Sequence, residues 1–308
     1  CYVDFSKAFD KVNYWKLFNS LLDDNVPVDI MSLLAFWYSH QEVYVRWQNI
    51  FSTKFGMSNG TRQGSSLSPY LFARYVRGLI LSISKSQIGC NIGGVFFNVL
   101  AYADDLVLLA PSWHGMQELI NLLYLQANMI DMVCNAKKTC CMVFNPRCKS
   151  RIVPCTFKNF LLHNVELAYV SSFKYFGHVL SNTTCDDSDI KREIKNLYVR
   201  ANVLTRQYSK CSQRVAILLF RSFCLCFYDI GLWEQYSATV YRSFNSCYHR
   251  CLKLFFKFRR RDSVTNILFT LGLPSFKTVL WNARCSVFSQ WSHSANSLVR
   301  HLNTMHIT

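Results

Sequence analysis

Two adjacent aspartates stand inside an apolar run, and they are the residues of this chain best suited to chemistry. Asp104 and Asp105 lie in the sequence VLAYADDLVLLA, with valines and leucines on both sides. A buried strand does not carry adjacent charges without a neutralising partner, because an unpaired buried charge costs several kcal/mol. Carboxylate oxygens suit a divalent cation such as magnesium. The alternative is a tight turn whose two aspartates face water.

A second acidic position lies at the start of the chain. Asp4 stands in a strand-like run, and Phe9, Val12, Leu17 and Leu21 then recur with helical spacing. Two acidic sites on strands can hold a pair of metal ions about 3.5–4 Å apart, which activates an attacking oxygen and steadies a leaving one. A surface carboxylate or a helix N-cap is the alternative for Asp4 alone.

A glycine-rich segment, GTRQGSSLSP at residues 60–69, lies between the two acidic sites. Gly60 and Gly64 bracket Arg62 and Gln63, and a helix-like apolar run follows. Glycine permits close backbone approach, and helix N-termini favour anions. A lone glycine-rich loop is weak evidence, but its place between the acidic sites strengthens the indication.

Five segments of the chain resemble successive motifs of reverse transcriptases from non-LTR (LINE-type) retrotransposons. They are YVDFSKAFDKV, GTRQGSSLSPYLF, YADD, NAKKTCCMVF and FKYFGHVL, and they run in the family's order from residue 2 to about residue 181. The later segment SFCLCFYDIGLWEQYS resembles the region that follows the polymerase palm in these elements. One departure is Ser65-Ser66, where the family usually has a cysteine-proline pair.

The resemblance implies catalytic roles for three carboxylates and one lysine. Asp4 and Asp104 match the principal ligands of two magnesium ions, with Mn²⁺ as an alternative ion, and Asp105 supports them. Lys138 matches the motif lysine proposed to protonate the pyrophosphate leaving group, although a solvated lysine is the alternative. Nucleotidyl transfer needs positioning and neutralisation of charge more than covalent work by the protein, and these residue types agree with that need.

The resemblance also implies contacts to the nucleotide, the template and the primer. Phe9 matches the bulky gate that excludes a ribose 2′-hydroxyl, with plain core packing as the alternative. Arg62, Gln63 and Gly64 stand where the family contacts the incoming nucleotide and the template. The hairpin that grips the primer terminus would comprise Phe173, Tyr175, Phe176 and Gly177.

The fold implied by the family is α+β, a right-hand polymerase palm with an antiparallel sheet, followed by a helical thumb-like domain. We expect the palm, with remaining finger and palm insertions, over residues 1–183. The helical thumb and C-terminal basic region would cover 184–308. The chain has no initiator methionine, and Cys1 falls on the first catalytic strand. We therefore expect the fingers to be missing and the chain to be a fragment or a truncated genomic copy.

Local patterns predict the elements that position these residues. The expected helices lie near 12–24, 28–39, 68–84 and 114–132, the last with Ser112 as its cap. The expected strands are a hairpin over 42–57, short strands near 95–110 with the paired aspartates at their turn, and strands at 138–144 and 173–180 that close the palm. A further helix from 187 on would bury a stripe of Ile190, Ile194, Leu197, Ala201 and Leu204.

The net charge of +16 is spread unevenly along the chain. Residues 1–150 carry 13 Lys and Arg against 10 Asp and Glu, whereas residues 151–308 carry 21 against 8. This asymmetry favours binding of a phosphate backbone by the C-terminal half. The expected partners are an RNA template, a DNA primer and deoxynucleoside triphosphates. For the run Arg259-Arg260-Arg261 alone, the solvated face of an amphipathic helix is an equal alternative.

The fourteen cysteines have irregular spacing and include no CxxC pair. We expect reduced, mostly buried thiols without disulfide partners in an intracellular protein of the cytoplasm and nucleus. Cys247, His249 and Cys251 lie close together, but one helical turn without a second ligand cluster is poor evidence for zinc.

The longest apolar stretch, residues 215–233, approaches the length that spans a membrane. Arg221 and Asp229 lie inside it, and each would cost about 2.5–3.5 kcal/mol near a bilayer centre. We therefore expect a buried helix packing on the palm and no membrane association.

These patterns lead to one main function and one alternative. The main prediction is an RNA-directed DNA polymerase domain of a non-LTR retrotransposon that uses two-metal nucleotidyl transfer and is inactive as this truncated chain. The alternative is a catalytically dead retroelement remnant that only binds nucleic acid. The missing fingers favour the alternative, whereas the intact set of Asp4, Asp104 and Asp105 favours the enzyme.

Overall fold

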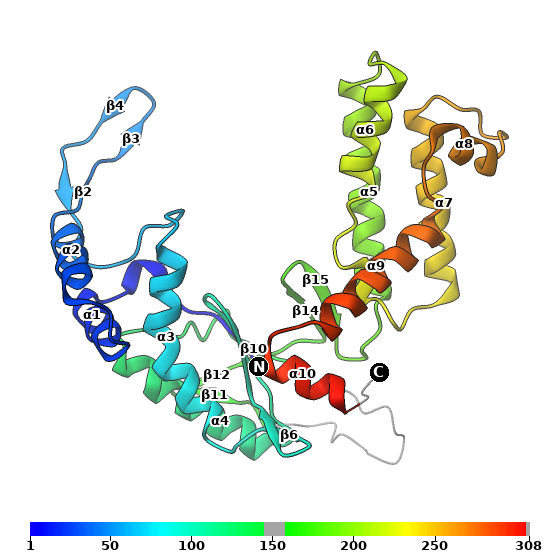
Figure 1. Cartoon of the computed structure of the whole chain (residues 1–308). Coiled ribbons are helices and arrows are strands. Elements are labelled where there is room, and N and C mark those ends of the chain that lie inside the picture. Colours follow the sequence, from blue (N-terminus) through cyan, green and yellow to red (C-terminus); the bar gives the residue numbers. More distant parts are fainter. Residues whose placement is uncertain (145–157, 306–308) are drawn as a thin grey trace. The chain divides into compact units, whose positions relative to one another are not determined.

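The chain folds into two compact units, each with a hydrophobic core of its own. The computed structural model describes residues 1–144 and 158–305. Within these ranges the first unit comprises 1–141 and 158–169, and the second comprises 142–144 and 170–305 (Figure 1). The first unit combines a sheet with helices, and the second is mainly helical, which confirms the predicted mixture of α and β structure.

Four helices build most of the first core, close to the predicted positions. They are α1 (Tyr14–Asp23), α2 (Val28–Ser39), α3 (Ser68–Ser84) and α4 (Trp113–Met129). Local chemistry fixes where two of them begin. The Asn13 side chain accepts backbone N–H groups at the start of α1, and the Ser112 hydroxyl accepts the Gly115 N–H at the start of α4, as predicted.

A five-stranded sheet completes the first unit, in the order β13-β10-β1-β9-β8. Its strands are β1 (Tyr2–Val3), β8 (Val99–Tyr102), β9 (Asp105–Leu108), β10 (Cys140–Cys141) and β13 (Ala168–Tyr169). All neighbours are antiparallel except β10 and β13, which pair in parallel. The sheet is therefore mainly antiparallel, as predicted, with one parallel pair that was not predicted.

Shorter hairpins extend from this framework, and the one predicted over 42–57 is present. Within it, β2 (Glu42–Val43) pairs with β5 (Phe55–Gly56), and β3 (Arg46–Trp47) pairs with β4 (Ile50–Phe51). Figure 1 shows this hairpin standing out from the end of α2. Two more hairpins join β6 (Cys90–Ile92) to β7 (Val95–Phe97) and β11 (Leu161–Leu162) to β12 (Val165–Glu166).

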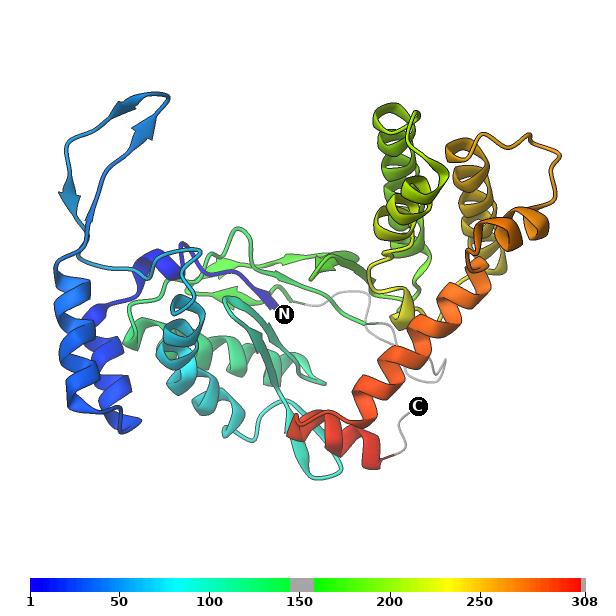
Figure 2. The same ribbon diagram turned by 45° about the horizontal axis from the view of Figure 1, so that its top comes forward.

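The second unit begins with a hairpin and continues as a helical bundle. Strand β14 (Ser172–Tyr175) pairs with β15 (His178–Ser181). The helices are α5 (Asp187–Gln207), α6 (Gln213–Cys224), α7 (Ala238–Phe255), α8 (Val264–Leu271), α9 (Phe276–Ser292) and α10 (Ser297–Thr304). Helix α5 packs against α6 and α7, and these three stand side by side in Figure 2. The predicted apolar stripe of α5 is buried at Ile190, Leu197, Ala201 and Leu204, and partly buried at Ile194.

One strand prediction is wrong. The segment 173–180 does not join the palm sheet, because β14 and β15 pair with each other in a separate two-stranded sheet. The backbone N–H of Val179 donates to Asp189 of α5 at 2.9 Å, which groups this hairpin with the helices. The compact units accordingly divide between Tyr169 and Val170, while the functional division at 183/184 stays a prediction.

We predicted that the apolar stretch 215–233 forms one buried helix, but it does not. Helix α6 ends at Cys224, and a short 3₁₀ helix, η2 (Ile230–Leu232), follows. On α6, Phe220 and Cys224 are buried, and the helix packs against α5. Within the described ranges, no helix combines the length and hydropathy that crossing a bilayer requires.

The cysteines of the described ranges are free thiols, and many of them are buried. Cys247 and Cys251 are buried on α7, with their Sγ atoms 4.0 Å apart. Their thiols face the backbone carbonyls of Ile194 and Leu197 on α5, at 3.8 and 4.0 Å. These two cysteines therefore belong to the helix–helix packing.

Candidate active site

Strand pairing brings the N-terminal aspartate beside the aspartate pair. In the antiparallel register of β1 and β9, Val3 lies opposite Leu106. One further step along that register places Asp4 beside Asp105. The hairpin of β8 and β9 carries Asp105 opposite Tyr102. Two segments far apart in the sequence thus meet at one end of the sheet.

The aspartate pair lies at the tight turn between β8 and β9, with Asp105 as the first residue of β9. Ala103 has a positive φ of 52°, and Ala103 and Asp104 connect the paired residues Tyr102 and Asp105. Both aspartates are exposed, whereas the following residues 106–108 are buried. The paired aspartates therefore lie at the turn between two short strands, as predicted, and the chain enters the core only after Asp105.

The carboxylates at this turn influence one another. The pKa of Asp105 is raised, first by partial burial against the sheet and then by the negative charges of Asp104 and Asp4. Like charges disfavour the ionised form of a neighbouring carboxyl group. The charges of the three aspartates are therefore close enough to influence one another.

One oxygen of Asp4 lacks a hydrogen-bond partner. Its Oδ2 atom is buried and accepts no hydrogen bond from the described part of the chain. The Nζ atom of Lys138 lies 4.0 Å from this oxygen, and the Lys138 side chain is 71% exposed. An ion pair so open to water contributes little stability. A buried carboxylate oxygen without a donor is costly, so Asp4 is suited to receive a cation.

The segment that leads into β10 holds the backbone of Asp4 in place. Phe5 forms an isolated antiparallel bridge with Cys134. The Asn135 N–H donates to the Asp4 carbonyl at 2.7 Å, and the Asp4 N–H donates to the Thr139 Oγ1 atom at 3.2 Å. The sequence analysis did not identify Asn135 and Thr139 as positioning residues. The available signal was their place on either side of the two lysines in NAKKT.

The glycine-rich segment is tied to the residues that follow Asp4. The Gly60 N–H donates to the Val12 carbonyl at 2.9 Å, and the Thr61 N–H donates to the Phe9 carbonyl at 2.8 Å. Gly60 has a φ of +92°, and a Cβ atom there would lie 2.8 Å from the Asp10 carbonyl oxygen. Only glycine permits this close approach.

Phe9 contacts the helix that follows the glycine-rich segment. Its ring stacks on that of Phe72 in α3, with centroids 4.4 Å apart and an interplanar angle of 23°. The Phe9 side chain is half-buried, so part of the ring packs on the core and part remains accessible. This position is compatible with both the gate and the core-packing interpretations.

The other predicted nucleotide contacts, Arg62, Gln63 and Gly64, are exposed. The side-chain amide of Gln63 lies 3.5 Å from Asp10 Oδ1. Gly64 has a φ of +84°, with open space where a Cβ atom would point. These residues form a polar, accessible segment next to the one that carries Phe9.

The predicted primer-gripping residues lie in the second unit, at the turn of the β14–β15 hairpin. Tyr175 pairs with His178 across a two-residue turn in which Phe176 and Gly177 have φ values of 46° and 87°. Two positive φ angles match the twist of a tight hairpin. A Cβ atom on Gly177 would lie 3.0 Å from the Tyr228 ring, so glycine is required here.

The residues present fit an oxygen-seeking divalent ion, although they do not form a complete cage. Within residues 1–144 and 158–305, no three His, Cys, Asp or Glu side chains gather closely enough to hold an ion by themselves. Mg²⁺ is usually bound by one or two carboxylates together with substrate phosphates and water. Asp4 and the Asp104–Asp105 turn supply carboxylates of this kind, including the buried oxygen without a partner.

Comparison with known proteins agrees with this site. Residues 1–180 match the family model described as reverse transcriptase (RNA-dependent DNA polymerase). The match covers more than half of the chain and includes Asp4, the glycine-rich segment, the aspartate turn and Lys138. The chain belongs to the reverse transcriptase family, and its similarity to retrotransposon proteins supports the predicted non-LTR type.

The similar proteins are polyproteins of R2 retrotransposable elements. The chain is 27% identical over 183 residues to the retrovirus-related Pol polyprotein from type-2 retrotransposable element R2DM of Drosophila melanogaster, covering 58% of this chain and 17% of that protein. It is 27% identical over 185 residues to the type-1 R2 polyprotein of Nasonia vitripennis, and the match covers 58% of this chain and 18% of that protein. It is 27% identical over 194 residues to the type-1 R2 polyprotein of Popillia japonica, and the match covers 59% of this chain and 30% of that protein. The chain thus spans less than a third of the length of each.

Proposed function

We propose that this chain carries the polymerase site of a non-LTR retrotransposon reverse transcriptase, which copies an RNA template into DNA by two-metal nucleotidyl transfer. The observation that carries the proposal is the meeting of Asp4 with Asp105 across β1 and β9, with a buried Asp4 oxygen that lacks a donor. In this proposal Asp4, Asp104 and Asp105 hold two Mg²⁺ ions, or Mn²⁺ in their place. The ions would steady the attacking and leaving oxygens.

The other residues position substrates and manage charge. Lys138, 4.0 Å from Asp4, would place a positive charge or a proton near the departing pyrophosphate. Phe9, braced by Phe72, would exclude a ribose 2′-hydroxyl by steric contact. Arg62, Gln63 and Gly64 would contact the incoming deoxynucleoside triphosphate and the template strand.

The hairpin of β14 and β15 would grip the DNA primer terminus through Phe173, Tyr175, Phe176 and Gly177. The tight turn at Phe176 and Gly177 supports this role, because a well-defined hairpin end could position a primer terminus. The functional palm would then extend to about residue 183, across the boundary between the two compact units.

We further propose that residues 1–308 alone extend a primer negligibly. Correct orientation of template and triphosphate supplies much of the rate in phosphoryl transfer. The segment shared with the matched relatives covers 17%, 18% and 30% of their lengths. A loss of orientation would lower the rate by several orders of magnitude.

The metal site can be tested without relying on synthesis. Mn²⁺ binding to residues 1–308, followed by electron paramagnetic resonance, should weaken at least tenfold in Asp4→Asn and Asp104→Asn. The matched control is Asp131→Asn, because Asp131 forms an ion pair with Lys16 away from this turn. Equal Mn²⁺ binding by all four proteins would contradict the assignment and favour a remnant that only binds nucleic acid.

A further inference from the structure

The carboxylates of the second unit are concentrated toward one end of helix α5. Apart from Asp262, the side-chain carboxylates of this unit's described residues lie in the segments 186–193 and 229–234. These segments contact each other, since Asp186 Oδ2 accepts the Glu234 N–H at 2.8 Å. Helix α5 has 21 residues and therefore extends about 30 Å from this acidic end.

The opposite end of α5 is strongly basic. The segments 206–214 and 253–261, which we call the basic tip, lie side by side because Lys257 Nζ donates to the Ser209 carbonyl at 2.8 Å. The nearest carboxylate in sequence, Asp262, accepts the Arg259 N–H at 2.7 Å. The cations of the basic tip are Arg206, Lys210, Arg214, Lys253, Lys257, Arg259, Arg260 and Arg261.

The arginine run of the basic tip is not part of a helix. Helix α7 ends at Phe255 and α8 begins at Val264, so Arg259, Arg260 and Arg261 lie in the connection between them. All three are exposed. The solvated face of an amphipathic helix, the alternative considered for this run, is therefore not what the structure contains.

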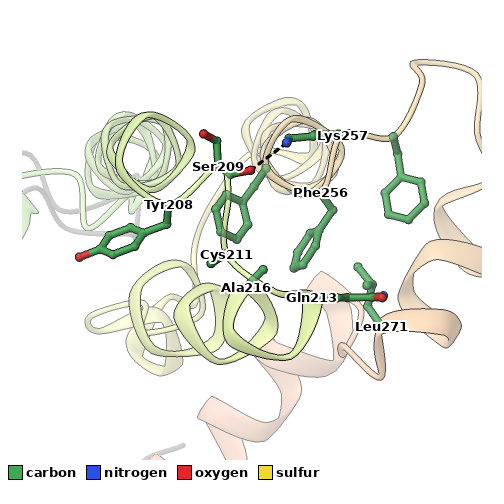
Figure 3. A pocket seen from close by; sticks show the side chains of 10 residues that line it. Tyr208, Ser209, Cys211, Gln213, Ala216, Phe256, Lys257 and Leu271 are labelled. Atoms are coloured by element: carbon green, nitrogen blue, oxygen red, sulfur yellow. Dashed lines mark hydrogen bonds between the residues drawn. The ribbon is translucent and has the colours of Figure 1, made fainter.

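A pocket of about 340 Å³ opens within the basic tip (Figure 3). Its walls come from the turn between α5 and α6, from the end of α7 and from Leu271 of α8. Ala216 on α6 lies at one side, and the Lys257–Ser209 hydrogen bond crosses between the two walls in Figure 3. Four of its lining residues are aromatic, namely Tyr208, Phe255, Phe256 and Phe258.

A pocket with aromatic lining and a cation, Lys257, within a basic segment suits a nucleotide. Bases stack on aromatic side chains whatever their identity, and cations hold the flanking phosphates. A volume near the lower end of the usual range for ligand pockets, about 300–1,000 Å³, suits one base and excludes a duplex. A purely apolar ligand would not account for eight cations in the basic tip with only one carboxylate, Asp262, nearby in sequence.

We propose that the basic-tip pocket binds one unpaired nucleotide of a single-stranded nucleic acid. The base would stack against one of the aromatic side chains that line the pocket, Tyr208 or Phe256, and the neighbouring phosphates would contact the tip cations. This inference rests on the proposed function only in taking nucleic acid as the partner of the chain. It requires neither metal ions nor synthesis.

The test measures binding of a 12-nucleotide single-stranded RNA to residues 1–308 in EDTA, by fluorescence anisotropy. Ala216→Trp fills the pocket. Tyr208→Ala removes one of the aromatic side chains that line it, and Tyr208 is 42% exposed. Each should weaken single-strand binding by about 5- to 150-fold, the worth of one stacked base. Binding of a blunt RNA duplex should be unchanged. The matched control is Leu218→Trp, which adds the same indole at an exposed position of α6 outside the pocket.

Two further arms separate stacking from charge. A strand with abasic sugars keeps its phosphates but has no base to stack in the pocket. The wild-type chain should therefore bind this strand with the same weak affinity that Ala216→Trp shows for the RNA. Replacing Arg259, Arg260 and Arg261 by Gln should weaken binding of both probes and reduce the dependence on salt. A single-stranded DNA probe of the same sequence shows whether binding depends on the ribose 2′-hydroxyl.

Several results would overturn the proposal. If Ala216→Trp and Tyr208→Ala bind the single-stranded RNA with the same affinity as Leu218→Trp, the pocket does not take part in binding. The same conclusion follows if the wild-type chain binds the abasic strand and the RNA with equal affinity. A change of oligomeric state with unchanged RNA affinity, measured by light scattering, would assign the pocket to a second copy of the chain. Failure of the wild-type chain to bind any RNA would reject the proposed function as well, whereas the other results would leave the Mn²⁺ site intact.

Discussion

The Nδ1 atom of His178 lies 3.4 Å from a carboxylate oxygen of Asp189, and this contact joins the β14–β15 hairpin to helix α5. Asp189 is fully buried. Its Oδ1 atom accepts the Val179 N–H at 2.9 Å and the Arg192 Nε–H at 2.7 Å, and its Oδ2 atom accepts the Trp233 indole N–H at 2.8 Å. One carboxylate therefore connects the hairpin, the helix and the segment that contains η2.

His178 is surrounded by negative charge. Asp186 faces its Nε2 atom at 3.7 Å, and Asp229 faces its Nδ1 atom at 3.7 Å. The pKa of His178 is raised, with the contact to Asp186 as the largest cause, although burial acts in the opposite direction and Asp189 and Asp229 add to the rise. Arg192 is the cation next to this group. The charged imidazolium is therefore the form that fits the folded hairpin.

The first prediction concerns the pH dependence of this hairpin's stability. Because the folded pKa of His178 is raised, its contribution is complete below its ordinary value of about 6.5 and is lost as the pH rises through the folded value. Amide exchange protection of residues 172–181 should therefore decrease from pH 6 toward pH 9, after correction for the intrinsic exchange rate.

His178→Gln is the control for that experiment, because it cannot titrate. Burial raises the pKa of Asp229, so its contribution also falls with rising pH, but this begins in the acid range. Protection that decreases equally in wild type and His178→Gln between pH 6 and pH 9 would show that His178 is not the titrating group.

The second prediction concerns the loss of Asp189. For this carboxyl, burial alone would raise the pKa, but hydrogen bonds from Arg192, Val179 and Trp233 outweigh it and the pKa is lowered. Asp189→Ala would leave these donors unpaired in the core, which should cost about 3–5 kcal/mol in the free energy of unfolding. Urea denaturation followed by fluorescence measures this loss. Glu234→Ala, an exposed carboxylate in the neighbouring segment, should change it by less than about 0.5 kcal/mol.

The third prediction tests the charge coupling at the candidate active site. Asp4 and Asp104 help to raise the pKa of Asp105, after partial burial. Asp4→Asn should therefore lower the pKa of Asp105, measured by carbon-13 NMR titration of labelled aspartates, and added Mg²⁺ should lower it in the wild-type chain. Asp23→Asn, an exposed substitution at the end of α1, is the control. An Asp105 titration unaffected by Asp4→Asn would mean that the two acidic segments do not form one site.

The fourth prediction compares two glycines of the same loop. Gly60 and Gly64 both have positive φ angles, but a Cβ atom at Gly60 would lie 2.8 Å from the Asp10 carbonyl oxygen, whereas at Gly64 it would meet open space. Gly60→Ala should destabilise the first unit by on the order of 1–3 kcal/mol more than Gly64→Ala does, because strain and a backbone clash are combined. Thermal unfolding of the two variants measures the difference, and equal midpoints would contradict the close approach.

Much of the local structure could be predicted from the sequence, because it depends on neighbouring residues. The periodic spacing of apolar residues predicted α1 to α5, and Ser112 predicted the start of α4. The order of acidic, glycine-rich and lysine-containing motifs predicted the family. The helix signals need only the positions of side chains within a few turns of one another, and the family signal needs only the order of short motifs along the chain.

The tertiary structure decided the relationships between distant segments. The turn at Asp104 and Asp105 was predicted, but the register of β1 against β9 decides which residue of that turn meets Asp4. The parallel pairing of β10 with β13 and the separate sheet of β14 and β15 are likewise non-local. Sequence patterns give little information on strand register, because neighbouring registers satisfy the same local preferences.

The buried charges of the second unit show the same limit most plainly. His178, Asp189 and Asp229 are single polar residues in separate elements, and each one alone has the pattern of a surface residue. Only folding brings them to one place, where lost hydration must be replaced by mutual contacts. The sequence by itself determined the polymerase family, the helices and the residues available for chemistry. The tertiary structure decided which of those residues touch, because contacts across long loops depend on the packing of the whole unit.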